Sequence, residues 1–246
     1  MSLDNLTDDA SVVVAGASGG IGAEFVRQLS ASPRIGRVFA LYREPPASAA
    51  AGVENLECDL ADEDSIRAAA AAVAAHGPVD AVIVASGLLH RGQIQPEKSL
   101  RSIDADVMLE VFRINTVGPV LLAKHFLPLM RRDGKSVFVA LSARVGSIDD
   151  NRLGGWVSYR ASKAALNQTM KTLAIEHARR RPDGVVASLH PGTVATNLSE
   201  LFSSGVPPAK LFTPEIAAAH LLRVIDGLTE ANTGGFFAWD GAPIDY

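Results

Sequence analysis

The sequence has little sulfur and lacks any long apolar run. It contains a single cysteine, Cys58, which cannot form an internal disulfide and therefore favours a cytoplasmic environment. No apolar run approaches the roughly 20 residues that a membrane helix needs. The N-terminus carries Asp4, Asp8 and Asp9 and lacks a basic segment before an apolar one. We therefore expect neither a membrane span nor a signal peptide.

The sequence also lacks clusters of one charge and histidines at metal-ligand spacing. The formal net charge is −4, and lysines and arginines are scattered along the chain, which argues against a nucleic-acid surface. The one basic run, Arg179 to Arg181, precedes Pro182 at the end of a helical pattern, where it complements the helix dipole. The six histidines show no zinc-site spacing, so we expect no metal.

Apolar runs of strand length alternate with helical patterns along the chain. Apolar residues make up 48% of the 246, enough for a sizeable core, and one domain over residues 1–246 is expected. The alternation predicts an α/β fold with a parallel sheet covered on both faces. Strand-like segments fall at 12–15, 38–42, 56–58, 81–85, 136–141, 185–189 and 235–239, and helical patterns at about 20–31, 63–76, 104–131, 157–180 and 214–228.

A glycine-rich turn stands between the first strand-like run and the first helical pattern. Gly16, Gly20 and Gly22 allow the backbone to turn sharply and to approach a pyrophosphate closely. The following helix would present free N–H groups and partial positive charge to that anion. The other interpretation is a glycine-rich turn without a ligand, but the strand–turn–helix context favours a dinucleotide site.

Tyr159 and Lys163 lie four residues apart in the predicted helix 157–180, and this spacing places both side chains on one face. A tyrosine normally keeps its proton to about pH 10. A nearby lysine cation favours the phenolate, so we expect it to lower the pKa of Tyr159. Such a pair can give a proton to a carbonyl or take one from an alcohol near neutral pH. Alone, the spacing is also typical of a solvated helix face.

Five motifs in order make the chain similar to a known superfamily. The sequence Gly16-x-x-x-Gly20-Ile21-Gly22 and the pair Tyr159-x-x-x-Lys163 resemble the nucleotide fingerprint and catalytic pair of the short-chain dehydrogenases/reductases. Matching segments are Cys58-Asp59-Leu60, Asn115 in Ile114–Pro119, and Pro191–Thr196; the segments 141–147 and 153–156 are similar to the branch with C-factor and sniffer-type carbonyl reductases. The resemblance implies a Rossmann-type, doubly wound, seven-stranded parallel sheet.

The resemblance also implies roles for individual residues. Tyr159 would be the acid or base, and Lys163 would lower its pKa and bond the nicotinamide ribose. Ser142 would polarise the carbonyl, and Asn115 would hold a water that links Lys163 to solvent; Asn115 could instead bond locally within its helix. Residues expected to contact the cofactor are Gly16, Ser18, Gly20, Ile21, Arg43, Asp59, Leu60, Ala85, Gly87, Tyr159, Lys163, Pro191, Gly192, Val194 and Thr196.

The chain departs from the family pattern at two small residues. After the fourth strand it has Ala85 where the family has an asparagine that braces the sheet. After the fifth strand Ala143 falls where the catalytic serine is expected, when the segment is aligned on Gly146. The loop up to Tyr159 is longer than usual, so either Ser142 or Ser147 could supply the hydroxyl.

The residues that end the second strand indicate the cofactor preference, because in this fold they contact the adenosine ribose. An acidic side chain there bonds the 2′-hydroxyl, whereas an arginine accepts a 2′-phosphate. This chain has Tyr42 and Arg43, and its first carboxylate, Glu44, lies past the strand. We therefore predict NADP(H) in preference to NAD(H); Arg43 could also be a solvated loop residue.

The predicted function is reduction of an aldehyde or ketone, or oxidation of the alcohol, on a small-molecule substrate. Substrate loops are expected at about 143–157 and 197–212, and the second could act as a lid. An apolar pocket could be lined by Leu88, Trp156, Leu198 and Phe202, or these side chains could simply pack the loops. A binding protein for NAD(P) with a signalling or regulatory role is the alternative, because of Ala85 and Ala143. The resemblance also implies a homodimer or homotetramer.

Overall fold

The computed structural model describes residues 3–46, 48–200, 207 and 210–246. The strands are β1 (Ala10–Ala15), β2 (Ile35–Tyr42), β3 (Val53–Glu57), β4 (Ala81–Val84), β5 (Ser136–Leu141), β6 (Gly184–His190), β7 (Thr193–Val194), β8 (Leu211–Phe212) and β9 (Phe236–Ala238). The α-helices are α1 (Gly20–Ser30), α2 (Glu63–Ala74), α3 (Ala105–Phe112), α4 (Gly118–Phe126), α5 (Val157–Ala178) and α7 (Pro214–Gly227).

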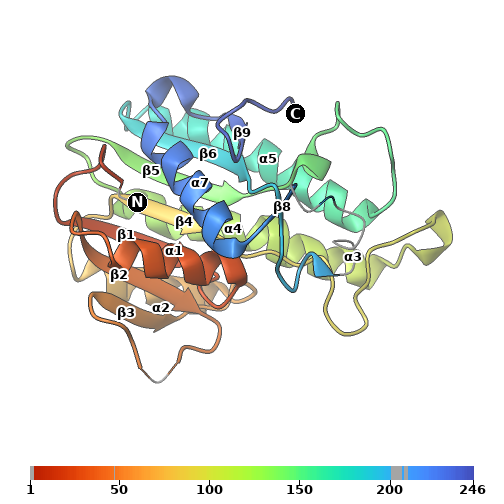
Figure 1. Ribbon diagram of the computed structural model, residues 1–246, viewed down its shortest axis with the longest axis horizontal. Coiled ribbons are helices and arrows are strands. Elements are labelled where there is room, and N and C mark those ends of the chain that lie inside the picture. The colour runs from red at the N-terminus through yellow and green to blue at the C-terminus, as the bar shows by residue number, and fades with distance from the viewer. Residues whose placement is uncertain (1–2, 47, 201–206, 208–209) are drawn as a thin grey trace.

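Within the described residues, seven strands form one parallel sheet in the order β3-β2-β1-β4-β5-β6-β9. The predicted seven-stranded, Rossmann-type sheet is therefore confirmed (Figure 1). The strand order runs one way from β1 to β3 and the other way from β4 to β9. This reversal opens a crevice at the carboxyl ends of β1 and β4, where open α/β sheets bind their ligands.

Alternate residues of the buried strands enter two separate cores. Val12 and Val14 of β1 pack with α1 and α7 on one face, while Val13 and Ala15 pack with α2, α4 and α5 on the other. Figure 1 shows α1 and α7 together in front of the sheet. Both faces are covered, which explains why β4 and β5 appear in the sequence as unbroken apolar runs.

The predicted helix over 104–131 is instead broken into several pieces. A π-helical turn, Arg113–Val117, separates α3 from α4, and a 3₁₀ turn, Leu127–Leu129, follows α4. The wider π-helical turn changes the direction of the Asn115 side chain, which forms hydrogen bonds with the backbone of Leu88. Gly118 begins α4 against Leu60, where an added Cβ would lie 2.8 Å from the Leu60 Cβ. Contacts distant in sequence therefore override the local helical pattern.

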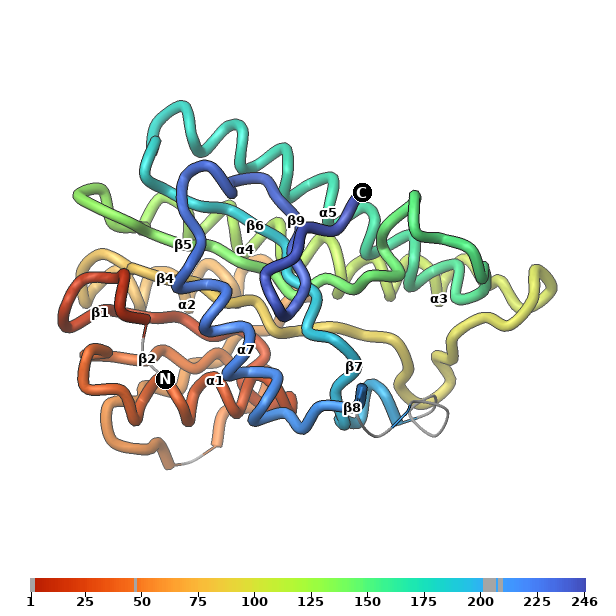
Figure 2. Tube along the Cα trace, turned by 45° about the horizontal axis from the view of Figure 1, so that its top comes forward, coloured from red at the N-terminus to blue at the C-terminus, as the bar shows by residue number. Residues whose placement is uncertain are grey.

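Three connecting segments meet beyond the carboxyl ends of the strands. They are the loop before α3, the loop before α5, and the β7–β8 pair, which the sequence did not predict; Figure 2 shows all three on the same side of the molecule. Of the helices in the described part of the chain, none is long and apolar enough to cross a membrane.

Candidate active site

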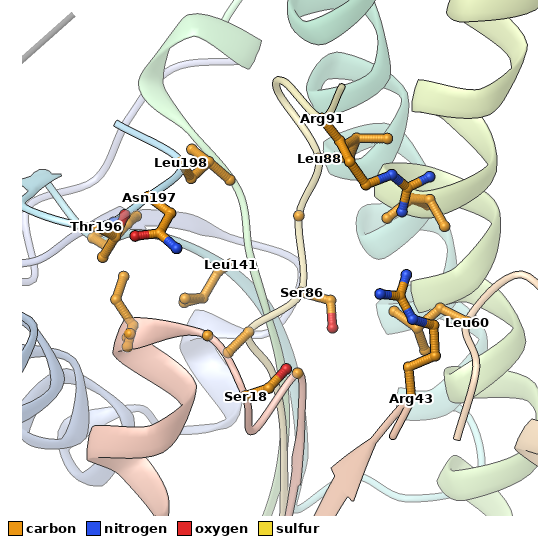
Figure 3. A pocket seen from close by; sticks show the side chains of 18 of the residues that line it. Ser18, Arg43, Leu60, Ser86, Leu88, Arg91, Leu141, Thr196, Asn197 and Leu198 are labelled. Atoms are coloured by element: carbon orange, nitrogen blue, oxygen red, sulfur yellow. The ribbon is translucent and has the colours of Figure 1, made fainter. Parts of the chain in front are cut away.

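A cavity of about 720 Å³ lies at the switch point of the sheet. Its walls come from the loops after β1, β2, β3, β4, β5 and β6, so the six segments meet although they are far apart in sequence (Figure 3). The structure brings together in its lining most of the predicted site residues: Gly16, Ser18, Gly20, Ile21, Arg43, Asp59, Leu60, Ala85, Gly87, Ser142, Tyr159, Lys163, Pro191 and Thr196.

The glycine turn after β1 forms the floor of the cavity at one end. Glycine is required there because a side chain would collide with neighbouring atoms. Gly16 has φ +84°, and a Cβ there would lie 2.4 Å from the Oγ of Ser86. At Gly20 a Cβ would lie 2.9 Å from Cγ2 of Thr196, and at Gly22 it would lie 2.1 Å from the carbonyl oxygen of Gly16. No side chain caps the first turn of α1. Its N–H groups therefore remain available to an anion in the cavity.

Tyr159 and Lys163 lie on the cavity side of α5, as the spacing predicts. Both are buried, with exposed fractions of 7% and 3%. The Lys163 Nζ donates a hydrogen bond to the Leu141 carbonyl oxygen (2.8 Å) and lies 5.9 Å from the centre of the Tyr159 ring. The carbonyl bond fixes the ammonium between β5 and the phenol. The edge of the Trp156 ring packs against Tyr159, with ring centres 6.5 Å apart.

The pKa values of this pair differ from the sequence expectation. Burial raises the pKa of Tyr159 above its usual value, so the expected lowering by Lys163 is wrong for the protein alone. Burial also lowers the pKa of Lys163 to about 8. The physical cause is the same for both: a low-dielectric site disfavours the charged form of each group, which is the anion of a phenol and the cation of an amine.

Ser142 and Ser147 occupy different environments. The Ser142 side chain lines the cavity, is buried, and its Oγ has no hydrogen-bond partner among the described residues. Ser147 is buried away from the lining, and its Oγ accepts a hydrogen bond from the Asp150 N–H (3.1 Å). Only Ser142 of these two hydroxyls therefore faces the cavity.

Asn115 is fully buried behind the cavity rather than in its lining. Its Oδ1 accepts from the Leu88 N–H (2.7 Å), and its Nδ2 donates to the Leu88 carbonyl oxygen (2.8 Å) and to the Ser162 Oγ (3.0 Å). The amide therefore joins the loop after β4 to α5. A Cβ added at Gly87 would lie 3.8 Å from the Asn115 Oδ1 and 3.7 Å from the Lys163 Nζ, so these two groups converge on one point.

The end of the cavity next to the carboxyl end of β2 is open to solvent. Arg43 follows β2 and leaves 60% of its side chain exposed; within the described residues it makes a long ion pair to Glu44 at 3.9 Å. Such a surface pair contributes little stability, so the guanidinium is available to a ligand. Asp59 and Leu60 line the same end, as predicted.

Some of the predicted residues lie outside the lining within the described chain. Gly192 (φ +79°) packs under the Phe212 ring, which a Cβ would approach to 2.8 Å, and Val194 is buried in β7. Leu88 and Leu198 line the cavity, whereas Trp156 stands behind Tyr159. Phe202 and half of the predicted second substrate segment (201–206, 208 and 209 of 197–212) fall outside the described residues.

Sequence reasoning missed Glu97, a buried carboxylate in the loop before α3. Its side chain accepts from the Ser158 N–H (3.2 Å) and the Ser158 hydroxyl, and its carbonyl oxygen accepts from the Trp156 N–H (2.7 Å). Glu97 thus caps α5 one residue before Tyr159, where a carboxylate favours the helix dipole. Also missed were Ser86, His90, Arg91 and Ile114 of the lining. For Ser86, His90 and Arg91, the available signal was their position after β4.

The doubly wound sheet, its glycine turn and the buried Tyr–Lys pair together define a Rossmann-type oxidoreductase that binds NAD(P). The sequence profile described as short chain dehydrogenase matches residues 10–206. The chain therefore belongs to the short-chain dehydrogenase/reductase family, and the predicted family resemblance is confirmed.

Individual relatives agree with this assignment. The chain is 34% identical over 238 residues to 1-hydroxy-2-glutathionyl-2-methyl-3-butene dehydrogenase of Rhodococcus sp. (strain AD45), covering 96% of this chain and 100% of the relative. It is 34% identical over 171 residues to C-signal of Myxococcus xanthus, covering 69% and 94%. The NADPH-bound carbonyl reductase from chicken fatty liver superposes with a TM-score of 0.84 at 26% identity, covering 98% and 95%. The C-factor and carbonyl-reductase branch is thus confirmed.

Proposed function

We propose that this oxidoreductase uses NADP(H) to reduce an aldehyde or ketone, or to oxidise the corresponding alcohol, with Tyr159 as the proton donor or acceptor. The observation that carries the proposal is the meeting of Tyr159, Lys163 and the unpartnered Ser142 hydroxyl in the lining of one cavity, beyond the glycine turn. The carbonyl reductase that superposes on this chain was solved with NADPH, which supports the same class of reaction.

The residues of the cavity fit a dinucleotide. The space that Gly16 and Gly20 leave free, and the uncapped first turn of α1, suit a pyrophosphate. Arg43 suits a 2′-phosphate, and Pro191 and Thr196 suit the nicotinamide end. When bound, the cofactor supplies or accepts the hydride. The preference for NADP(H) over NAD(H) rests on Arg43 and on the distance of Glu44 from the strand end.

Tyr159 acts as the acid in the direction of reduction. Its raised pKa keeps the phenol protonated at neutral pH, so the hydroxyl can give its proton to the carbonyl oxygen as the alcohol forms. The phenolate that remains lies beside the Lys163 ammonium, which is largely protonated at neutral pH because its pKa is about 8. The cation stabilises the anion only after the proton has moved, which is when stabilisation is needed.

Ser142 and Asn115 prepare the site around this proton transfer. Among the residues that the structure describes, the Ser142 hydroxyl has no hydrogen-bond partner to give up, so it can donate to the substrate carbonyl oxygen and stabilise its developing negative charge. Asn115 holds Leu88 and Ser162 in place, and in the family role it also keeps a water beside Lys163. The convergence of Asn115 Oδ1 and Lys163 Nζ near Gly87 supports that second role.

A second candidate function is NAD(P) binding with little turnover, in a signalling or regulatory protein. The similarity to C-signal favours it, together with Ala143 in place of the expected serine. Steady-state turnover separates the two functions, because a pure binder gains nothing from a buried phenol beside an ammonium.

Two further proposals rest on the family resemblance and the composition. We expect a homodimer or homotetramer, which light scattering tests directly. We also keep the prediction of a cytoplasmic location as one domain over residues 1–246, which cell fractionation and limited proteolysis test.

The experiment for the main proposal follows loss of NADPH absorbance against a panel of aldehydes, ketones and diketones. Turnover by the wild-type protein that disappears in Tyr159→Phe, with NADPH binding retained, supports the reductase. Binding of NADPH without turnover on any member of the panel contradicts it and favours the second candidate.

A further inference from the structure

Two arginines from different loops face one another at the adenosine end of the cavity. Arg43 follows β2, and Arg91 lies in the loop after β4; both line the cavity. Figure 3 shows their guanidinium groups pointing toward one another, with Leu60 beside them. Two like charges repel in this arrangement unless an anion lies between them. This geometry was invisible in the sequence, where 48 positions separate the two residues.

The direction of Arg91 is fixed by its neighbours. Its Nη2 pairs with Glu110 of α3 at 2.8 Å, one turn before Ile114, which also lines the cavity. The adjacent His90 points the other way, and its Nε2 contacts the Asn197 carbonyl oxygen at 2.7 Å. The loop after β4 therefore spans the cavity, with His90 toward the nicotinamide segment and Arg91 toward the adenosine end.

The backbone at Arg91 is also held in place. The N–H and carbonyl groups of Arg91 and Ile94 exchange two hydrogen bonds of 3.0 Å around Gly92, which has φ +57°. The turn and the ion pair to Glu110 order the Arg91 stem before any ligand binds. About half of the side chain (47%) stays exposed, so the guanidinium keeps donors available to solvent or to an anion.

We propose that Arg91 is a second specificity-determining residue, which together with Arg43 binds the 2′-phosphate of NADP(H). The proposal rests on the proposed use of NADP(H) and extends it, because the glycine turn carries no basic residue of its own. Arginine pairs with phosphate through charge-assisted, often bidentate hydrogen bonds. NAD(H) offers only a hydroxyl there and no anion for the two guanidinium groups to share, so Arg91 discriminates between the two cofactors.

The test measures dissociation constants for NADPH and NADH by fluorescence in the wild type, Arg91→Ala and Arg43→Ala. We expect Arg91→Ala to weaken NADPH binding about tenfold and to change NADH binding less than about twofold. Competition by 2′,5′-ADP, but not by 5′-AMP, should weaken in the same variant, since these fragments differ by the phosphate alone. Arg91→Gln is measured in the same way, so that a folding defect of the alanine variant leaves the question answerable.

Two control variants separate this role from a structural one. Arg101→Ala removes the same charge from the same loop, at an exposed position outside the cavity lining, and should change neither constant. Glu110→Gln removes the ion-pair partner and should leave NADPH binding tight. If Glu110→Gln reproduces the loss seen in Arg91→Ala, Arg91 only ties the loop to α3 and the proposal is wrong.

The remaining outcomes distinguish this proposal from the proposed function. Equal effects of Arg91→Ala on NADPH and NADH, or no effect on either, overturn the role of Arg91. Loss of NADPH selectivity in Arg43→Ala alone also overturns it, while the preference for NADP(H) stands. A wild-type protein that binds NADH more tightly than NADPH overturns both.

Discussion

Asp80 at the amino end of the central sheet and Ser142 at its carboxyl end differ in how their buried polar atoms are satisfied. At the amino end, Asp80 precedes β4, is completely buried, and accepts from the Thr7 hydroxyl (2.8 Å), the Ser11 N–H (2.8 Å) and the Arg131 guanidinium. At the carboxyl end, Ser142 follows β5 with an Oγ that has no partner within the described chain. Nδ1 of His190, which ends β6, likewise has no hydrogen-bond partner within the described chain.

The difference indicates that Asp80 serves stability and that Ser142 serves chemistry. A buried polar group without a hydrogen bond costs free energy, so a native protein keeps few of them. The amino end satisfies Asp80 fully and thereby holds the strand starts together. At the carboxyl end the Ser142 hydroxyl has no partner within the described chain and lies beside a cavity, where a ligand can satisfy it. Replacing Asp80 should therefore lower the free energy of unfolding, whereas replacing residues that line the cavity should lower turnover.

Tyr159→Phe should show the largest effect, and only at the carboxyl end. Removing the transferable proton should lower kcat by about a thousandfold, within the usual range for a general acid. The ring and its contact with Trp156 stay, so NADPH affinity and the unfolding midpoint should remain near the wild-type values. Steady-state kinetics, a binding titration and urea unfolding measure the three quantities. Near-normal turnover would rule out the acid role.

Asp80→Ala should show the reverse pattern. It leaves the Arg131 guanidinium, which is only 20% exposed, without its buried partner, and should lower the free energy of unfolding by roughly 3–5 kcal/mol. Asp133 also pairs with Arg131, at 3.6 Å, but it is 85% exposed; Asp133→Ala should cost less than about 1 kcal/mol. Urea unfolding measures both. Turnover per folded molecule should not change. A selective loss of turnover in Asp80→Ala would contradict the inference that Asp80 serves stability and not chemistry.

Ser142→Ala should cost activity without costing stability. Loss of a donor to the developing oxyanion should lower kcat about a hundredfold. No protein hydrogen bond is lost, so the unfolding free energy should stay constant or rise slightly. The matched variant is Ser147→Ala, whose hydroxyl bonds Asp150 and should hardly affect kcat. If the Ser147 variant loses the activity instead, the hydroxyl has been assigned to the wrong residue.

Activity should also fall as pH rises through the pKa of Lys163. Below about pH 8 the amine is charged and stabilises the Tyr159 phenolate; above it, each further unit should lower kcat/KM for the cofactor about tenfold. This parameter reports the pKa values of the essential groups in the free protein. A profile that stays flat across pH 8 would show that the charge of Lys163 is not required.

His190 provides the smallest test, through stability in acid. Burial, aided by Arg144, lowers the pKa of His190 from 6.5 to about 4, so the unfolded chain binds a proton first as pH falls. Stability is therefore lost between about pH 6.5 and pH 4. Wild type should lose about 2 kcal/mol more than His190→Gln between pH 7 and pH 5, by urea unfolding. Equal losses in the two proteins would show that His190 carries no such cost.

The sequence predicted the parts of the molecule that depend on local patterns. Strands β4 and β5 are unbroken apolar runs, and the glycine turn and Tyr159–Lys163 spacing are local too, so the fold and most of the lining were predictable. The π-helical turn at Asn115, the position of Glu97 and the approach of Arg91 to Arg43 depend on contacts across 27 or more positions. The expected lowering of the Tyr159 pKa failed for a related reason, because burial depends on the complete fold.

The hydrogen bonds of Glu97 have a consequence for anyone who redesigns this protein. Its side chain and carbonyl oxygen join the loop before α3 to the start of α5, so two walls of the cavity form one mechanical unit. A loop grafted from a relative into residues 143–157 alone would leave Glu97 and Ser158 in place but would replace Trp156, whose N–H donates to the Glu97 carbonyl oxygen. A change of substrate preference therefore requires that the loop before α3 and the loop before α5 be exchanged together.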